Sequence, residues 1–223
     1  MPRDLLFIRM PRCASASIRT FCDAYHIDYV DAVNYGFWGQ TGGRSILKRF
    51  KYFFGPQSLS RRIFIEYGGD KYAEKFKFTS VRNPYARAMS IWRHDSFSSI
   101  LTFTEFCECL NSNRFPSRCA KWHASVCADH VFTKGELKVD YVLKVESLIP
   151  DLINALKPFG ISSDQINEFF GSNHRVDNSV RFLPDEKKQV TISEAYGSYE
   201  RDSVRKYYEK DFETFGYSEE VFW

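Results

Sequence analysis

A short segment near the amino terminus, PRCASAS at residues 11–17, combines small residues with one arginine and two serines. Small residues let backbone N–H groups approach an anion closely, and Ser15 and Ser17 can add hydroxyl donors. Arg12 adds a permanent positive charge. The segment predicts a cradle for an oxyanion, with an ordinary strand-to-helix turn as the alternative.

A second segment, VRNPYARAMS at residues 81–90, also places an arginine and a serine where an anion can bind. Arg82 precedes a predicted helix, and Ser90 lies on the second turn of that helix. The two side chains can bind one phosphate through charge-assisted hydrogen bonds. The alternative is a salt bridge from Arg82 to a carboxylate, with Ser90 packed inside the helix.

Neither segment is a phosphate loop of the nucleoside triphosphate type. That loop reads G-x-x-x-x-G-K-[ST], and residues 11–17 contain no glycine. A metal-dependent phosphotransferase also needs a magnesium carboxylate at a strand end, and none is obvious in the sequence. This class therefore remains an alternative rather than the favoured interpretation.

Apolar runs that alternate with helical segments must position both loops. We predict strands at residues 4–10, 28–33, 76–81 and 141–145, and helices at 16–25, 59–67, 85–93, from a Thr104 cap to Leu110, from a Ser147 cap to about 157, and at 193–210. Residues 34–57 hold five glycines and predict a loop. The alternation predicts an α/β fold: a three-layer sandwich with a mainly parallel central sheet, binding ligands beyond the strands' carboxyl ends.

Composition limits the class of protein. The chain has 223 residues, 43% hydrophobic and 17% aromatic, which predicts one domain over residues 1–223. The formal net charge of +3 is too slight to indicate nucleic-acid binding. The amino-terminal residues do not form a signal peptide, and no run of about 18 apolar residues predicts a transmembrane segment. We therefore expect a cytoplasmic protein whose six cysteines are reduced thiols.

Taken together, the segments resemble the sulfotransferases that use 3'-phosphoadenosine 5'-phosphosulfate (PAPS), in particular the carbohydrate branch that includes the heparan sulfate 2-O-sulfotransferases. Residues 11–17 resemble P-K-T-A-[GS]-T-S, and FKFTSVRNPYARAMS at 76–90 matches F-K-F-x-x-V-R-N-P-x-x-R-x-x-S nearly completely. VDYVLKVE at 139–146 is similar to V-D-F-V-x-R-x-E. Residues 173–175 resemble the loop that closes over the nucleotide, and 207–217 resemble the last helix with its F-G-Y ending.

The resemblance implies a P-loop-like fold and in-line, metal-independent transfer of a sulfuryl group from PAPS to an acceptor hydroxyl, with a saccharide as the leading acceptor. Arg12 would bind the oxygen that bridges phosphorus and sulfur, where negative charge grows during transfer. Arg82 and Ser90 would hold the 3'-phosphate. The donor-binding residues implied are Arg12, Cys13, Ala14, Ser15, Ala16, Ser17, Ile18, Arg82, Ser90 and Arg175.

Three residues of the first loop depart from the branch. Arg12 replaces the usual Lys, as in protein-tyrosine sulfotransferases, while Cys13 and Ala16 each replace a Thr. Arginine keeps the charge and adds a second donor direction. The two missing hydroxyls remove possible hydrogen bonds to the donor, which points to weaker donor binding.

The general base is harder to assign. Relatives often carry His or Glu shortly before the helix that precedes the R-N-P strand, but residues 55–59 read GPQSL. His123 is the favoured substitute and, with Arg12, a predicted catalytic residue; Glu66 and His94 are the alternatives. For each of these side chains a purely structural role is also an open interpretation.

Two further interpretations remain. Cysteines and histidines are concentrated between residues 107 and 130, which suggests zinc, but no C-x-x-C pair occurs and buried thiols are favoured, so we expect no metal. A nonenzymatic binder of a nucleotide or anionic glycan is supported by the missing base and by the aromatic, basic stretch at 35–54.

Overall fold

The computed structural model describes residues 5–31, 74–93, 100–133, 135–172 and 191–220. Its central sheet consists of four parallel strands in the order β2-β1-β3-β6. These are β2 (Asp28–Asp31), β1 (Leu5–Arg9), β3 (Phe76–Val81) and β6 (Tyr141–Lys144). The predicted α/β class with a parallel sheet is therefore confirmed.

Helices surround this sheet. They are α1 (Ser15–Ala24), α5 (Pro84–Trp92), α7 (Phe103–Ser112), α8 (Arg118–His123), α9 (Ala128–Val131), α10 (Leu148–Leu156), α11 (Ser163–Gly171), α13 (Ile192–Ala195), α14 (Ser198–Tyr207) and α15 (Glu209–Phe215). Short 3-10 turns, η2 (Val145–Ser147) and η3 (Lys157–Phe159), flank α10, and β4 (Phe132–Thr133) pairs antiparallel with β5 (Glu136–Leu137). Within the described ranges, no helix is both long and apolar enough to span a membrane.

Alternation along the strands sends side chains to two separate cores. Phe7 pairs in register with Phe78, and their rings lie 5.3 Å apart in a core shared with α1, α10 and α11. Leu6 and Ile8 point to the opposite face, where they join residues of α9 and α15. Both faces of the sheet are thus covered, as a parallel sheet requires.

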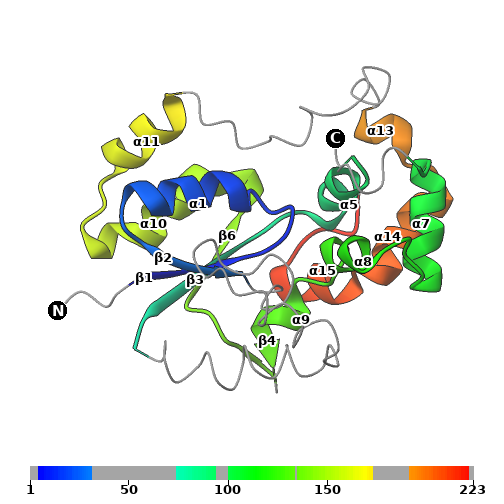
Figure 1. Cartoon of the computed structure of the whole chain (residues 1–223), viewed down its shortest axis with the longest axis horizontal. Coiled ribbons are helices and arrows are strands. Elements are labelled where there is room, and N and C mark those ends of the chain that lie inside the picture. Colours follow the sequence, from blue (N-terminus) through cyan, green and yellow to red (C-terminus); the bar gives the residue numbers. More distant parts are fainter. Residues whose placement is uncertain (1–4, 32–73, 94–99, 134, 173–190, 221–223) are drawn as a thin grey trace, which may run out of the picture.

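A third core lies among the helices that gather at one end of the sheet, on the right in Figure 1. Tyr85 and Met89 of α5 are buried there against Phe106 of α7 and Val204 of α14. Because α5 begins directly after β3, this packing fixes the helix at the carboxyl end of the central strands. The two candidate loops therefore rest on well-packed supports.

Several predicted elements need correction. The cap of α7 is Thr102, not Thr104: Thr102 accepts from the N–H of Glu105, whose carboxylate accepts in return. This capping box satisfies two backbone N–H groups at the start of the helix, which a lone threonine two residues later would not do. The predicted final helix at 193–210 is three helices, interrupted before Gly197 and at Tyr208.

Ser147 occupies the N-cap position of α10, but its hydroxyl donates to the Asp151 carboxylate and makes no side-chain cap bond. The predicted helix at 59–67, the loop at 34–57 and residues 32–33 of the second strand lie outside the described residues.

Candidate active site

The loop after β1 has an unusual backbone. Arg12 and Ala14 adopt left-handed conformations, with φ of 64° and 55°. Non-glycine residues adopt this region at a cost of about 1–3 kcal/mol each and are concentrated at functional sites. Alternation of left- and right-handed residues turns successive N–H groups toward one concave side, an arrangement that binds anions.

The same loop is fixed from behind through its carbonyl oxygens. Ser80 Oγ donates to the Cys13 carbonyl at 2.5 Å, and Arg87 Nε donates to the Pro11 carbonyl at 3.3 Å. These donors come from β3 and α5, so the neighbouring strand and its helix set the position of the loop. With these two carbonyls engaged inside the protein, the loop is held in a conformation suited to presenting N–H groups outward.

The amino terminus of α1 continues this cradle. Ala14 occupies the N-cap position, and among the described residues no side chain caps the helix there. The first turn carries no acidic residue, so the partial positive charge of the helix terminus is not neutralised locally. The terminus is therefore suited to an anion.

The loop after β3 is fixed differently. Asn83 caps α5, because its Oδ1 accepts from the N–H groups of Tyr85 and Ala86, and Pro84 takes the first helical position. The N–H of Asn83 donates to Glu146 Oε1 at 2.7 Å, and Tyr217 Oη donates to Glu146 Oε2 at 3.0 Å. One carboxylate thus joins this loop to the segment that follows α15.

The structure brings Arg12 and Ser90 together across 78 positions of sequence. Arg12 donates to Ser90 Oγ through Nε at 3.2 Å and through Nη2 at 3.0 Å. Ser90 is buried in α5, so the hydroxyl is a fixed acceptor rather than a mobile one. The two segments for which the sequence predicts anion binding therefore meet in the folded chain.

A hollow of about 130 Å³ lies beside the first loop, with Arg12 among its lining residues. Its wall is formed by Arg9, Met10, Pro11, Arg12, Ser15, Trp122 and His123. The volume suits a sulfuryl or phosphoryl group rather than a whole nucleotide, since pockets for larger ligands exceed about 300 Å³. Two of the residues in this wall, Arg9 and Arg12, carry a positive charge, which favours an anion nearby.

His123 lies in this wall, with its ring centroid 4.7 Å from that of Trp122. It is the candidate base that the structure places beside Arg12. Glu66, His94 and Arg175 lie outside the described residues.

The other predicted donor-binding residues separate into two groups. Ser15 lines the hollow, whereas the side chains of Cys13, Ser17 and Ile18 are buried. Cys13 and Ile18 belong to the apolar cores, so any contact they make with a donor is through backbone N–H groups. Ala14 and Ala16 likewise offer backbone groups alone.

Cys13 is close to a second thiol and to two arginines. Its sulfur lies 3.9 Å from that of Cys127. Burial raises the pKa of Cys13, but the hydrogen bond with Cys127 and the charges of Arg87 and Arg82 lower it overall. The bond to Cys13 and burial raise the pKa of Cys127.

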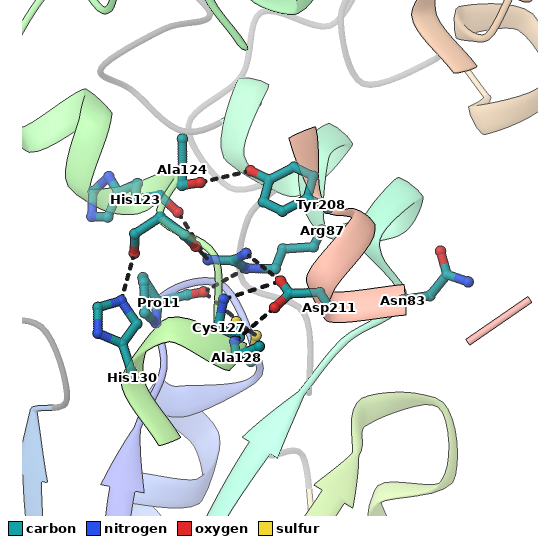
Figure 2. Close-up of polar contacts among 12 residues, drawn as sticks. Pro11, Asn83, Arg87, His123, Ala124, Cys127, Ala128, His130, Tyr208 and Asp211 are labelled. Atoms are coloured by element: carbon teal, nitrogen blue, oxygen red, sulfur yellow. Dashed lines mark hydrogen bonds and ion pairs between the residues drawn. The ribbon is translucent and has the colours of Figure 1, made fainter. Parts of the chain in front are cut away.

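Sequence reasoning missed one buried residue, Arg87, which is 1% exposed. Besides Pro11, its guanidinium donates through Nη2 to the carbonyls of His123 and Ser125, at 3.2 and 2.7 Å. Figure 2 shows these contacts together with the Asp211 carboxylate, whose Oδ2 lies 3.5 Å from Nη1. The signal was present, because Arg87 is the second arginine of R-N-P-x-x-R, but nothing in that pattern states what it binds.

In the described ranges, no group of three histidine, cysteine or acidic residues is arranged to hold a metal ion.

The four parallel strands with helices on both faces define an α/β protein, and its candidate anion site lies at the carboxyl edge of the sheet. The model of the sulfotransferase family matches residues 4–218, and the chain therefore belongs to that family. Comparison with curated proteins and with solved structures gives no match. Membership of this family supports sulfuryl transfer as the general chemistry of the protein.

Proposed function

We propose that this protein transfers the sulfuryl group of PAPS to a hydroxyl of an acceptor, with a saccharide as the acceptor class. The observation that carries the proposal is the contact between Ser90 and Arg12, which also lines the hollow. It joins the loop expected to hold the 5'-phosphosulfate to the helix expected to hold the 3'-phosphate.

Arg12 supplies the charge stabilisation. Its guanidinium lines the hollow and would neutralise the negative charge that grows on the bridging oxygen as the S–O bond breaks. The N–H groups at the start of α1 support the same anion, and transfer by this route is in-line and uses no metal.

His123 is proposed to take the proton of the acceptor hydroxyl. A general base must lie within hydrogen-bond reach of that proton, and His123 shares the wall of a small hollow with Arg12. The aromatic ring of Trp122, in the same wall, offers an apolar face for the C–H groups of a sugar ring.

Calorimetric titration tests donor recognition first. The purified protein is titrated with 3'-phosphoadenosine 5'-phosphate (PAP), with adenosine 5'-phosphate, and with ATP plus magnesium. Selective binding of PAP is the expected result, because the proposed ligand of Arg82 and Ser90 is the 3'-phosphate, which adenosine 5'-phosphate and ATP lack. Preference for ATP, or no binding of PAP, would overturn the proposal.

Acceptor class is tested separately with radiolabelled PAPS. The panel comprises desulfated glycosaminoglycan oligosaccharides, a tyrosine peptide and a small alcohol. Labelling of the oligosaccharides supports the saccharide proposal, and labelling confined to the peptide or alcohol contradicts it. PAP binding without transfer to any acceptor would identify a nonenzymatic binder.

A further inference from the structure

Arg87 contacts two segments that line the candidate active site. Pro11 belongs to the donor loop (residues 11–17), His123 ends α8, and both belong to the wall of the hollow. The guanidinium donates to the carbonyl oxygen of each, at 3.3 and 3.2 Å. A single planar group therefore spans the distance between the donor loop and the candidate base.

The segment that follows His123 is held by the same cluster. Ser125 O accepts from Arg87, Ala124 O accepts from Tyr208 Oη at 3.0 Å, and the Asp211 carboxylate accepts from the N–H groups of Cys127 and Ala128. Figure 2 shows α15 bringing Asp211 against Arg87 from the far side. Residues 123–128 are thus fixed through their backbone.

The charge of Arg87 is balanced inside this cluster. Asp211 Oδ2 lies 3.5 Å from Nη1, and the guanidinium carbon lies 5.3 Å from the centroid of the Tyr208 ring. A buried cation without compensation would be strongly destabilising, so these groups account for the presence of an arginine here. They also limit the ways in which the guanidinium can be oriented.

We propose that Arg87 is a positioning residue, which sets the separation between the donor loop and His123. This inference rests on the proposed sulfuryl transfer in this hollow. Arginine suits the task because its rigid fork presents donors in several directions, whereas lysine presents one compact ammonium group. A displacement of about 1 Å between reacting groups can lower a rate about 100-fold.

Arg87→Lys separates this role from donor binding. The variant keeps a positive charge beside Asp211 but cannot reach three carbonyl oxygens at once. The donor loop keeps its contact from Ser80 to Cys13, and Arg12, Arg82 and Ser90 are unchanged. We expect kcat to fall about 10- to 100-fold while the Kd for PAP stays within about threefold of wild type.

The matched control is Leu152→Ala. Leu152 is fully buried in α10, in the core formed with α1 on the other side of the sheet, so its truncation also destabilises the protein. A loss of stability alone lowers the thermal midpoint of both variants. It leaves the kcat of the folded fraction unchanged, as we expect for Leu152→Ala.

A second readout does not depend on donor or acceptor. The imidazole signals of His123 are recorded by long-range proton–nitrogen NMR in the ligand-free protein and assigned with His123→Gln. We expect these signals to move or broaden in Arg87→Lys and not in Leu152→Ala. If Arg87→Lys does not fold, Asp211→Asn takes its place in the test. This variant leaves Arg87 in place but loosens its orientation, so we expect it to move or broaden the His123 signals as well.

The inference is overturned if Arg87→Lys and Asp211→Asn behave as Leu152→Ala does, with lower thermal midpoints but unchanged His123 signals. Failure of the proposed function is a different result: wild-type protein that does not bind PAP. In that case the NMR comparison still decides whether Arg87 positions His123.

Discussion

Arg12 Nη2 lies 3.0 Å from Ser90 Oγ, so the first loop and the helix after β3 are in direct contact at the site. The parallel pairing of β1 with β3 is the reason, because it brings the carboxyl ends of the two strands to the same edge of the sheet. A change at either residue is therefore expected to affect the whole donor site.

Ser90→Ala removes the acceptor of Arg12 and a proposed donor to the 3'-phosphate. Loss of one hydrogen bond to a charged group costs about 1.5–3 kcal/mol, so we expect the Kd for PAP to rise at least about tenfold. Calorimetry measures the change. Ser203→Ala, a buried serine in α14 that contacts Asn111, is the control, and an equal effect there would contradict the assignment.

Arg82→Ala and Arg12→Ala should affect different quantities, the first the Kd for PAP and the second kcat. Arg82→Ala is expected to raise the Kd for PAP about tenfold or more, because a charged contact with the 3'-phosphate is lost. Arg12→Ala is expected to lower kcat about 100-fold, since its proposed ligand gains charge during transfer. Steady-state kinetics and calorimetry compare them with exposed Arg201→Ala, and equal small effects of both would refute the roles.

His123→Gln tests the proposed base. General base catalysis contributes about 100- to 10,000-fold, so kcat should fall by that order and its rise with pH should disappear. PAP binding should persist, because the phosphate contacts are elsewhere. The control is His26→Asn, an exposed histidine whose left-handed backbone (φ 54°) asparagine tolerates. An unchanged pH profile in His123→Gln would eliminate this base.

Tyr217→Phe removes the hydroxyl that binds Glu146. Burial and then the charge of Glu146 raise the pKa of Tyr217, so the hydroxyl is protonated and donates at neutral pH. We expect the free energy of unfolding to fall by about 1–2 kcal/mol in urea titrations, and PAP affinity to fall severalfold. Tyr199→Phe, at an exposed residue of α14, should change neither, and a wild-type affinity in Tyr217→Phe would disprove the link.

Glu105→Gln tests the capping box of α7. The backbone N–H and then the hydroxyl of Thr102 lower the pKa of Glu105. A lowered folded pKa contributes stability above the unfolded value near 4.5, and this contribution disappears as pH falls through the folded pKa. Urea unfolding at pH 7 and pH 3 should show a smaller loss on acidification in Glu105→Gln than in wild type.

The same unfolding measurements on Glu108→Gln provide the control, since Glu108 is an exposed glutamate of the same helix outside the capping box. If Glu105→Gln loses as much stability on acidification as wild type does, the carboxylate does not contribute through this cap.

Local sequence patterns predicted an element correctly where one strong signal marked it. Phe76–Val81 alternates before Asn83 and Pro84, and both the strand and the start of α5 agree with the prediction. The cap of α7 differs from the prediction because Thr102 has Glu105 three residues later as its reciprocal capping partner, and Thr104 has no such partner. The break near Gly197 was missed because the surrounding residues suit a helix.

Contacts between residues far apart in the chain could not be predicted from local sequence patterns. The sequence predicts separate anion contacts for Arg12 and Ser90, but their direct contact depends on the pairing of β1 with β3. The left-handed backbone of Arg12 and Ala14 could not be inferred, because glycine is the usual signal for it. The contacts of Arg87 depend on segments that meet only in the folded chain.

The carboxylate of Glu146 connects the R-N-P loop to Tyr217, and Asp211 of α15 supports the cluster around Arg87. Tyr85 Oη also donates to the carbonyl of Glu219 at 2.8 Å. These supports come from residues that the ribosome adds after both anion-binding segments. During synthesis the two loops therefore emerge before the residues that hold them, so these contacts form only after the carboxyl-terminal residues can pack against the earlier part of the chain.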